Sequence, residues 1–307
     1  MKLSALFTVV TVVTVTLGAS SAAHAEVKVV ASVPDLAALT KEVGGALVSV
    51  KALSLPTQDP HFVDAKPSLA LELNRANLLV LVGLDLEIGW LPTLVVGARN
   101  AAIQPGNPGY LDCSQFVHRL DIPAANVDRS HGDIHPGGNP HYLYDPRAAA
   151  AVAQGIAARL AELDPGHRAT YEANRDALLA RLTAARGRWE KRLASYRGAP
   201  IVAYHKTWTY VADWLGLDQV GFLEPKPGIP PNPQHVASLL GLARTRKVRL
   251  VLQESYYPDA ASKLVAEKIP AQLVFVHGGT NFAGGESYEQ HIDALVESLG
   301  KAFDAAR

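Results

Sequence analysis

Four histidines in this chain, His61, His141, His205 and His277, each come just after a short apolar run that is typical of a β-strand. In open α/β sheets, ligands bind outside the carboxyl ends of the strands. Four imidazoles at such an edge form a complete first shell for a tetrahedral borderline metal such as zinc. The pattern therefore predicts that the fold gathers these four side chains at one metal site.

The alternative is that each of these histidines hydrogen-bonds a loop carbonyl in its own neighbourhood. The four are separated by 80, 64 and 72 residues, and two come from each half of the chain, so no local motif makes them neighbours. For a single residue the alternative would be the better interpretation. Four histidines at equivalent places favour a shared metal, because only the fold could explain the repetition.

A second group of metal-binding residue types lies in the segment Ser-His-Gly-Asp-Ile-His-Pro, which contains His131, Asp133 and His135. Gly132 and Pro136 make a helix improbable here, so the spacing of the two histidines is not helical. One interpretation is a mobile polar loop. The other is an auxiliary site that captures metal weakly before the main site binds it.

The first 25 residues have the features of an export signal. Lys2 supplies the positive charge, Leu6 to Leu17 is apolar and rich in Thr, and Ala23-His24-Ala25 is a small-x-small cleavage site. This apolar segment is too short to span a membrane. We therefore predict cleavage near Ala25 and a mature protein located in the periplasm.

Composition excludes some classes of function. The formal net charge is 0, so no basic patch argues for nucleic acid. Cys113 is the only cysteine, so the chain has no internal disulfide. We expect a monomer whose apolar core alone holds it together.

Strand-like and helix-like segments alternate along the chain, which predicts an α/β fold with parallel sheets. Asp164-Pro165 marks the start of a helix that runs to about residue 196, roughly 30 residues or about 45 Å. We expect two small βα sandwich lobes joined by this one long rigid helix, with the metal site in the cleft between them. The predicted segments are the signal peptide at 1–25, the N-terminal lobe at 26–147, a helical connector at 148–198 and the C-terminal lobe at 199–307.

Several of these segments resemble the metal-specific solute-binding proteins of bacterial ABC importers for zinc and manganese. Gly138-Asn139-Pro140-His141 followed by Asp145-Pro146 is the most specific match, because it is close to the family's second-ligand motif. The resemblance covers essentially the whole mature chain. Its other matching segments are Gln58-Asp59-Pro60-His61, Leu78 to Leu91, Tyr204-His205, Glu224-Pro225 and Glu254.

One departure from the family pattern bears on the choice of metal. The family usually supplies an Asp as its fourth ligand after the last strand, and here that strand ends in His277. The resemblance then implies that His277 replaces the Asp, and that His at the position of His205 favours zinc. Four nitrogens also suit zinc better than manganese, which prefers oxygen. Glu254 and Asp145 are additional candidates, as further ligands or as partners of the ligands.

The sequence therefore predicts a periplasmic protein that binds Zn²⁺ tightly and passes it to an ABC permease in the inner membrane. A periplasmic metallochaperone is a further candidate partner. Alternatives are the same fold binding manganese or iron, a lobe adapted to adhesion, or a secreted zinc hydrolase. A hydrolase needs three protein ligands, an open position for water and a general base, for which Glu254 is the candidate.

Overall fold

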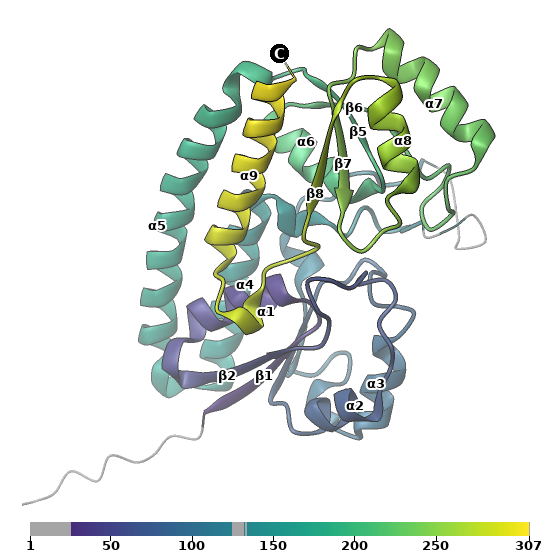
Figure 1. The fold of residues 1–307 in the computed structure, drawn as a ribbon. Coiled ribbons are helices and arrows are strands. Elements are labelled where there is room, and N and C mark those ends of the chain that lie inside the picture. The colour runs from purple at the N-terminus through teal and green to yellow at the C-terminus, as the bar shows by residue number, and fades with distance from the viewer. Residues whose placement is uncertain (1–25, 125–131, 133, 307) are drawn as a thin grey trace, which may run out of the picture.

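The computed structural model describes residues 26–124, 132 and 134–306. The chain forms two α/β lobes, each built on one parallel four-stranded sheet, and a long helix joins them (Figure 1). The fold class predicted from the sequence is therefore confirmed. The predicted signal peptide and its cleavage site lie outside the described residues.

The sheet of the N-terminal lobe has the strand order β2-β1-β3-β4, and every pairing is parallel. Every residue of β3 is buried, as expected for a strand covered by helices on both faces. Its elements are β1 (Val27–Ala31), α1 (Pro34–Gly44), β2 (Val48–Ala52), α2 (Pro67–Asn74), β3 (Leu78–Leu81), α3 (Leu91–Ala98) and β4 (Tyr110–Asp112).

The C-terminal lobe repeats this topology with the strand order β6-β5-β7-β8, again all parallel. The two lobes therefore share one arrangement of strands, although their sequences show no repeat. Its elements are β5 (Pro200–Ala203), α6 (Thr209–Leu215), β6 (Asp218–Phe222), α7 (Pro233–Thr245), β7 (Leu250–Glu254), α8 (Ala260–Lys268), β8 (Gln272–Val276) and α9 (Tyr288–Ala305).

Two long helices connect the lobes. The first is α5 (Arg168–Leu193), which follows α4 (Pro146–Leu163). It has 26 residues, or a length of about 39 Å, and short 3₁₀ turns extend it at both ends. Helix α9 runs beside α5 in the same direction (Figure 1). Ion pairs join Arg188 to Glu289 at 3.1 Å and Arg192 to Asp304 at 2.8 Å. The predicted linking helix is confirmed, and α9 reinforces it.

The segment from residue 277 to 287 forms a strap that crosses from β8 to the N-terminal lobe. The amide of Gly278 donates to the carbonyl of Pro56 at 2.9 Å. The backbone N–H and the hydroxyl of Thr280 both donate to Oδ1 of Asp35, at 3.1 and 2.6 Å, in a buried position. The chain just after β8 is therefore fixed against the opposite lobe.

The apolar core has three parts. One continuous cluster joins the inner faces of both sheets to α1, α4, α5 and α9. Separate clusters lie beneath α2 and α3 in the N-terminal lobe and beneath α7 and α8 in the C-terminal lobe. Among the described residues, no helix is both long and apolar enough to span a bilayer.

Two elements were not predicted from the sequence. Helix α3 is apolar along most of its eight residues and shows no clear 3.6-residue periodicity. Strand β4 has only three residues and lies in a stretch, 104–140, that is rich in Gly and Pro, a composition typical of loops. The boundaries assigned to the lobes at residues 147 and 198 remain predictions.

Helix α5 packs in the apolar core that both lobes share, so substitutions on this helix test how the lobes pack together. Leu178 is fully buried on this helix, so Leu178→Ala should lower the free energy of unfolding by about 2–5 kcal/mol. The exposed Lys191 provides a matched control, and Lys191→Ala should change it by less than about 0.5 kcal/mol. Urea unfolding measures both. Equal effects would show that α5 is not packed as described.

Candidate metal centre

Three of the predicted ligands meet between the lobes. One ligand atom each of His61, His141 and His205 lies within 4.8 Å of the other two. The centroids of the three rings are 5.2 to 5.3 Å apart, and all three residues are buried. Side chains 144 residues apart in the sequence thus meet at one point.

His61 lies in the loop that follows β2, and its neighbours hold it in place. Oδ1 of Asp59 accepts from the backbone N–H of His61 at 2.9 Å and from its Nδ1 at 2.7 Å. The indole N–H of Trp90 donates to the carbonyl of Pro60 at 2.9 Å. Since Nδ1 carries the proton donated to Asp59, Nε2 is left with a lone pair for a metal.

The Gly-Asn-Pro-His motif positions His141. Oδ1 of Asn139 accepts from the backbone N–H of His141 at 2.9 Å, and the Asn139 side chain donates to the carbonyl of Lys206 at 2.8 Å in the other lobe. Nε2 of His141 is buried and makes no hydrogen bond with the described residues. A buried nitrogen of this kind indicates a missing partner.

His205 follows β5 in the C-terminal lobe. Its Nδ1 donates to Oε2 of Glu224 at 2.6 Å, and both residues are buried. Glu224 follows the neighbouring strand β6, and the amide of Gly228 donates to the same oxygen at 3.2 Å. Two of the three histidines therefore have a carboxylate behind them, an arrangement that orients metal-binding imidazoles in proteins.

A fourth histidine, His135, contacts His61 beside this group of three. It is buried, its Nδ1 donates to the carbonyl of Leu84 at 2.8 Å, and its ring centroid is 5.3 Å from that of His61. Its Nε2 lies 3.3 Å from Nε2 of His61. The sequence interpretation placed His135 in an auxiliary loop. Its nearness to the Gly-Asn-Pro-His motif is the signal that could have assigned it to the main site.

The contact between His61 and His135 has a chemical consequence. Both Nδ1 atoms are already donors, to Asp59 and to the carbonyl of Leu84, so both Nε2 atoms face each other as acceptors. Two lone pairs at 3.3 Å repel unless a proton or a metal ion lies between them. Two nitrogens bound to one tetrahedral zinc at 2.0–2.1 Å would be about 3.3 Å apart, which agrees with the observed spacing.

Charge and burial keep the centre ready for a cation. Burial, together with the neighbouring His61, His205 and His135, holds the pKa of His141 well below 6.5, so this ring is neutral at neutral pH. Burial raises the pKa of Asp59, but hydrogen bonds and charge from His61 outweigh it, and the net pKa is lowered. The centre thus combines a neutral imidazole with an ionised carboxylate.

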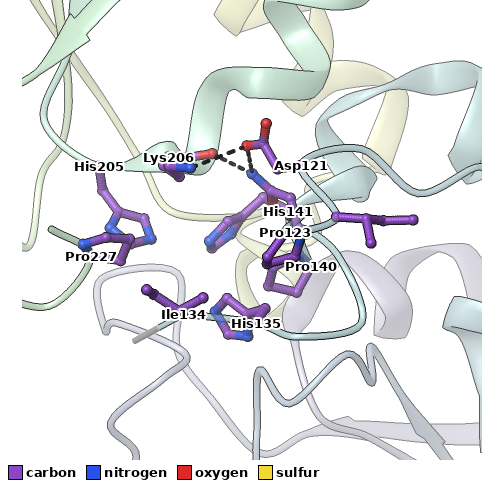
Figure 2. A pocket seen from close by; sticks show the side chains of 11 residues that line it. Asp121, Pro123, Ile134, His135, Pro140, His141, His205, Lys206 and Pro227 are labelled. Carbon is purple, nitrogen blue, oxygen red and sulfur yellow. Dashed lines mark hydrogen bonds and ion pairs between the residues drawn. The ribbon is translucent and has the colours of Figure 1, made fainter. Parts of the chain in front are cut away.

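A pocket of about 330 Å³ leads to the histidines. Figure 2 shows His135 and His141 from the N-terminal lobe and His205 from the C-terminal lobe lining it. At its rim, Lys206 and Asp121 form an ion pair at 3.8 Å. The pocket provides a route from solvent to the centre.

The structure does not place His277 in this cluster. Its side chain is exposed, and its Nδ1 lies 3.5 Å from Oγ of Ser255. The residues that follow it are bound to Pro56 and Asp35 of the N-terminal lobe, and among the described residues His277 does not belong to the group of side chains that could hold a metal. The prediction of His277 as fourth ligand therefore has no support in the geometry.

The other candidates also lie outside the cluster. Asp145 caps α4 by accepting from the backbone N–H of Arg147 at 2.8 Å, and it also pairs with the guanidinium of Arg147. Glu254 ends β7, fully buried, and neither of its oxygens makes a hydrogen bond with the described residues. His131 and Asp133 lie outside the described residues.

Comparisons with known proteins agree with a metal centre. Residues 29–302 match the family described as "Zinc-uptake complex component A periplasmic". A manganese ABC transporter substrate-binding lipoprotein of Streptococcus gordonii is 25% identical over 92% of each chain. The high-affinity zinc uptake protein ZnuA of Paracoccus denitrificans is 28% identical over 64% of this chain and 66% of that protein. The iron-binding protein YfeA of Yersinia pestis is 23% identical over 90% and 86%.

Two solved structures of ZnuA have a fold similar to that of this chain. A crystal structure of ZnuA superposes with a TM-score of 0.75 at 25% identity, over 91% of this chain and 99% of that chain. A zinc-bound deletion variant of ZnuA also reaches 0.75 at 25% identity, over 91% and 98%.

The buried carboxyl group of Glu254 should make the stability of the apoprotein depend on pH. Burial raises its pKa to about 8, whereas in the unfolded chain it titrates near 4.5. Above pH 4.5 the unfolded chain releases this proton first, so the cost to folding grows as pH rises towards 8. Glu254→Gln should therefore stabilise the apoprotein by about 3–4 kcal/mol at pH 7–8, and by almost nothing at pH 4.5. Thermal unfolding across this range measures the difference. A pH-independent effect would contradict the assignment.

Proposed function

This chain belongs to the periplasmic component A family of zinc-uptake complexes, the metal-binding components of ABC metal importers, and we propose that its cargo is Zn²⁺. We assign four ligands: His61, His135, His141 and His205. The observation that carries this proposal is the 3.3 Å contact between two Nε2 atoms whose Nδ1–H groups already have acceptors. A zinc ion at this place would turn that repulsion into two bonds.

The donor set supports zinc over manganese. All four proposed ligand groups are imidazoles, and imidazole suits zinc, whereas manganese prefers carboxylate, carbonyl and water oxygen. The carboxylates of Asp59 and Glu224 hydrogen-bond to Nδ1 of His61 and His205. Four nitrogens also complete a tetrahedral shell without an added ligand.

The same carboxylates explain how a doubly charged ion could be buried. Four neutral imidazoles leave the full charge of Zn²⁺ uncompensated. Asp59 and Glu224 bring two negative charges to positions one imidazole away from the ion. A buried cation is stable only when opposite charge and hydrogen bonds surround it, so this pair would make the loaded centre nearly neutral.

We further propose that the protein is exported by cleavage near Ala25, works in the periplasm as a monomer and transfers zinc to a membrane permease. Several relatives are named as substrate-binding lipoproteins of ABC transporters, which supports a transport role over catalysis. A metallochaperone that loads the protein is a second proposed partner. The position of Glu254, buried and outside the histidine cluster, gives no support to a hydrolase.

Relatives named for manganese and iron make those ions the main alternative cargo. Metal analysis of protein purified from periplasm without added metal, followed by competition titration with Zn²⁺, Mn²⁺ and Fe²⁺, decides among them. We expect one equivalent of zinc and a preference for zinc in the titration. Manganese or iron as the bound metal would overturn the zinc assignment and leave the transport role intact.

The ligand set makes a direct prediction. Replacing His61, His135, His141 or His205 with Ala should weaken zinc binding by at least about 100-fold, because each change removes a metal–nitrogen bond. His277→Ala is the matched control and should bind zinc like the wild type, since His277 is exposed away from the cluster. Competition titration with a chelator measures all five. Normal zinc affinity in His135→Ala would remove His135 from the ligand set. A loss of zinc affinity in His277→Ala would show that His277 is a ligand.

The carboxylate behind His205 gives a second prediction. Glu224→Gln keeps the size of the side chain but removes its charge, and it should lower zinc affinity about 10- to 100-fold. The carboxamide oxygen still accepts a hydrogen bond from Nδ1–H of His205, so the circular dichroism spectrum should be unchanged. If affinity does not change in Glu224→Gln, its charge does not contribute to the centre.

A further inference from the structure

We propose that the turn formed by residues 82–87 is a positioning element for His135, and that Glu87 is the residue that holds this turn in shape. The inference rests on the proposed function, because it assumes that His135 is a metal ligand. It adds the reason why a histidine from a Gly- and Pro-rich segment belongs to the main site.

The turn has an unfavourable backbone conformation. Gly83, Leu84 and Asp85 are consecutive residues in the left-handed region, with φ of 77°, 52° and 62°. Glycine adopts this region freely, but Leu and Asp do so at a cost in conformational free energy. Two such residues in succession persist only where the surrounding structure fixes them, and such positions cluster at functional sites.

The carboxylate of Glu87 supplies that fixation. Its Oε1 accepts from the backbone N–H of Val82 at 2.7 Å and from the hydroxyl of Ser32 at 2.6 Å. Its Oε2 accepts from the backbone N–H of Gly83 at 3.1 Å. The side chain is almost fully buried, so these three donors have no water to replace it. Glu87 therefore ties the turn to β1 and to the end of β3.

The conformation of the turn sets the direction of one carbonyl group. The carbonyl of Leu84 accepts from Nδ1 of His135 at 2.8 Å. A carbonyl only accepts, so this contact fixes the proton on Nδ1 and leaves Nε2 of His135 to face His61 at 3.3 Å. The turn thus sets both the tautomer and the direction of the ring.

The segment that carries His135 fits closely against the same turn. The amide of Gly138 donates to the carbonyl of His135 at 3.1 Å, closing a tight turn. A Cβ atom at Gly137 would lie only 2.9 Å from Cδ2 of Leu84. On its other side, the amide of Asn139 donates to the carbonyl of Leu120 at 2.8 Å. The backbone of His135 and its ring are therefore both fixed before a metal arrives, which lowers the entropy cost of binding.

The test is a double-mutant cycle between Glu87 and His135, measured by zinc competition titration and by the visible absorption spectrum of the Co²⁺-substituted protein. Glu87→Gln places an N–H₂ group against a backbone donor and should release the turn. We expect it to lower zinc affinity about tenfold and to shift the cobalt spectrum from a four-nitrogen tetrahedral form to that of His135→Ala. In the His135→Ala background, Glu87→Gln should have almost no further effect on affinity.

Two further variants make the result specific. Glu42→Gln alters another partly buried carboxylate of the N-terminal lobe, one that pairs with Arg181 on α5, and it should leave the cobalt spectrum unchanged. Gly137→Val disturbs the contact with Leu84 from the other side and should reproduce the spectral change of Glu87→Gln, even if Glu87→Gln itself does not fold.

The outcomes separate this inference from the proposed function. Additive losses of Glu87→Gln and His135→Ala, or an unchanged cobalt spectrum in both Glu87→Gln and Gly137→Val, would overturn the positioning role while zinc binding by the wild type stands. Failure of the wild type to bind zinc would instead remove the proposed function.

Discussion

The centre depends on one electrostatic constraint: two imidazole lone pairs face each other across 3.3 Å in a buried place. Asp59 and the carbonyl of Leu84 hold the Nδ1 protons, so neither ring can turn its own N–H towards the other without losing a hydrogen bond. Such an arrangement calls for a cation. His141, whose buried Nε2 makes no hydrogen bond with the described residues, and His205, directed by Glu224, each place a ligand atom within 4.8 Å of one on His61.

The fold explains how this constraint is maintained. His61, His135 and His141 belong to the N-terminal lobe and His205 to the C-terminal lobe, so the centre exists only while the lobes stay in register. Helices α5 and α9 run side by side across the junction, and the strap at residues 277–287 joins β8 to Asp35. These connections favour a centre of nearly fixed shape, in which metal exchanges through the pocket beside His135 and Lys206.

Much of this could be predicted from the sequence, because strand-like runs and Pro-initiated helices mark the lobes and the linking helix. The convergence of His61 and His205 followed from their positions after strands, and that of His141 from the Gly-Asn-Pro-His motif, since no strand among the described residues directly precedes His141. The fourth position could not be predicted in this way. Whether the chain after β8 turns towards the centre depends on the contact between Thr280 and Asp35, 245 residues apart, and the place of His135 depends on a left-handed turn at Leu84. Neither feature leaves a periodic signal in the sequence.

The most direct test of the central claim is X-ray absorption at the zinc K-edge of the protein loaded with one equivalent of zinc. We expect a first shell of four nitrogens at about 2.0–2.1 Å, with the outer-shell scattering of four imidazole rings. A shell with only three imidazoles and an oxygen, or one of five or six ligands, would contradict the assignment of His61, His135, His141 and His205 as the complete set.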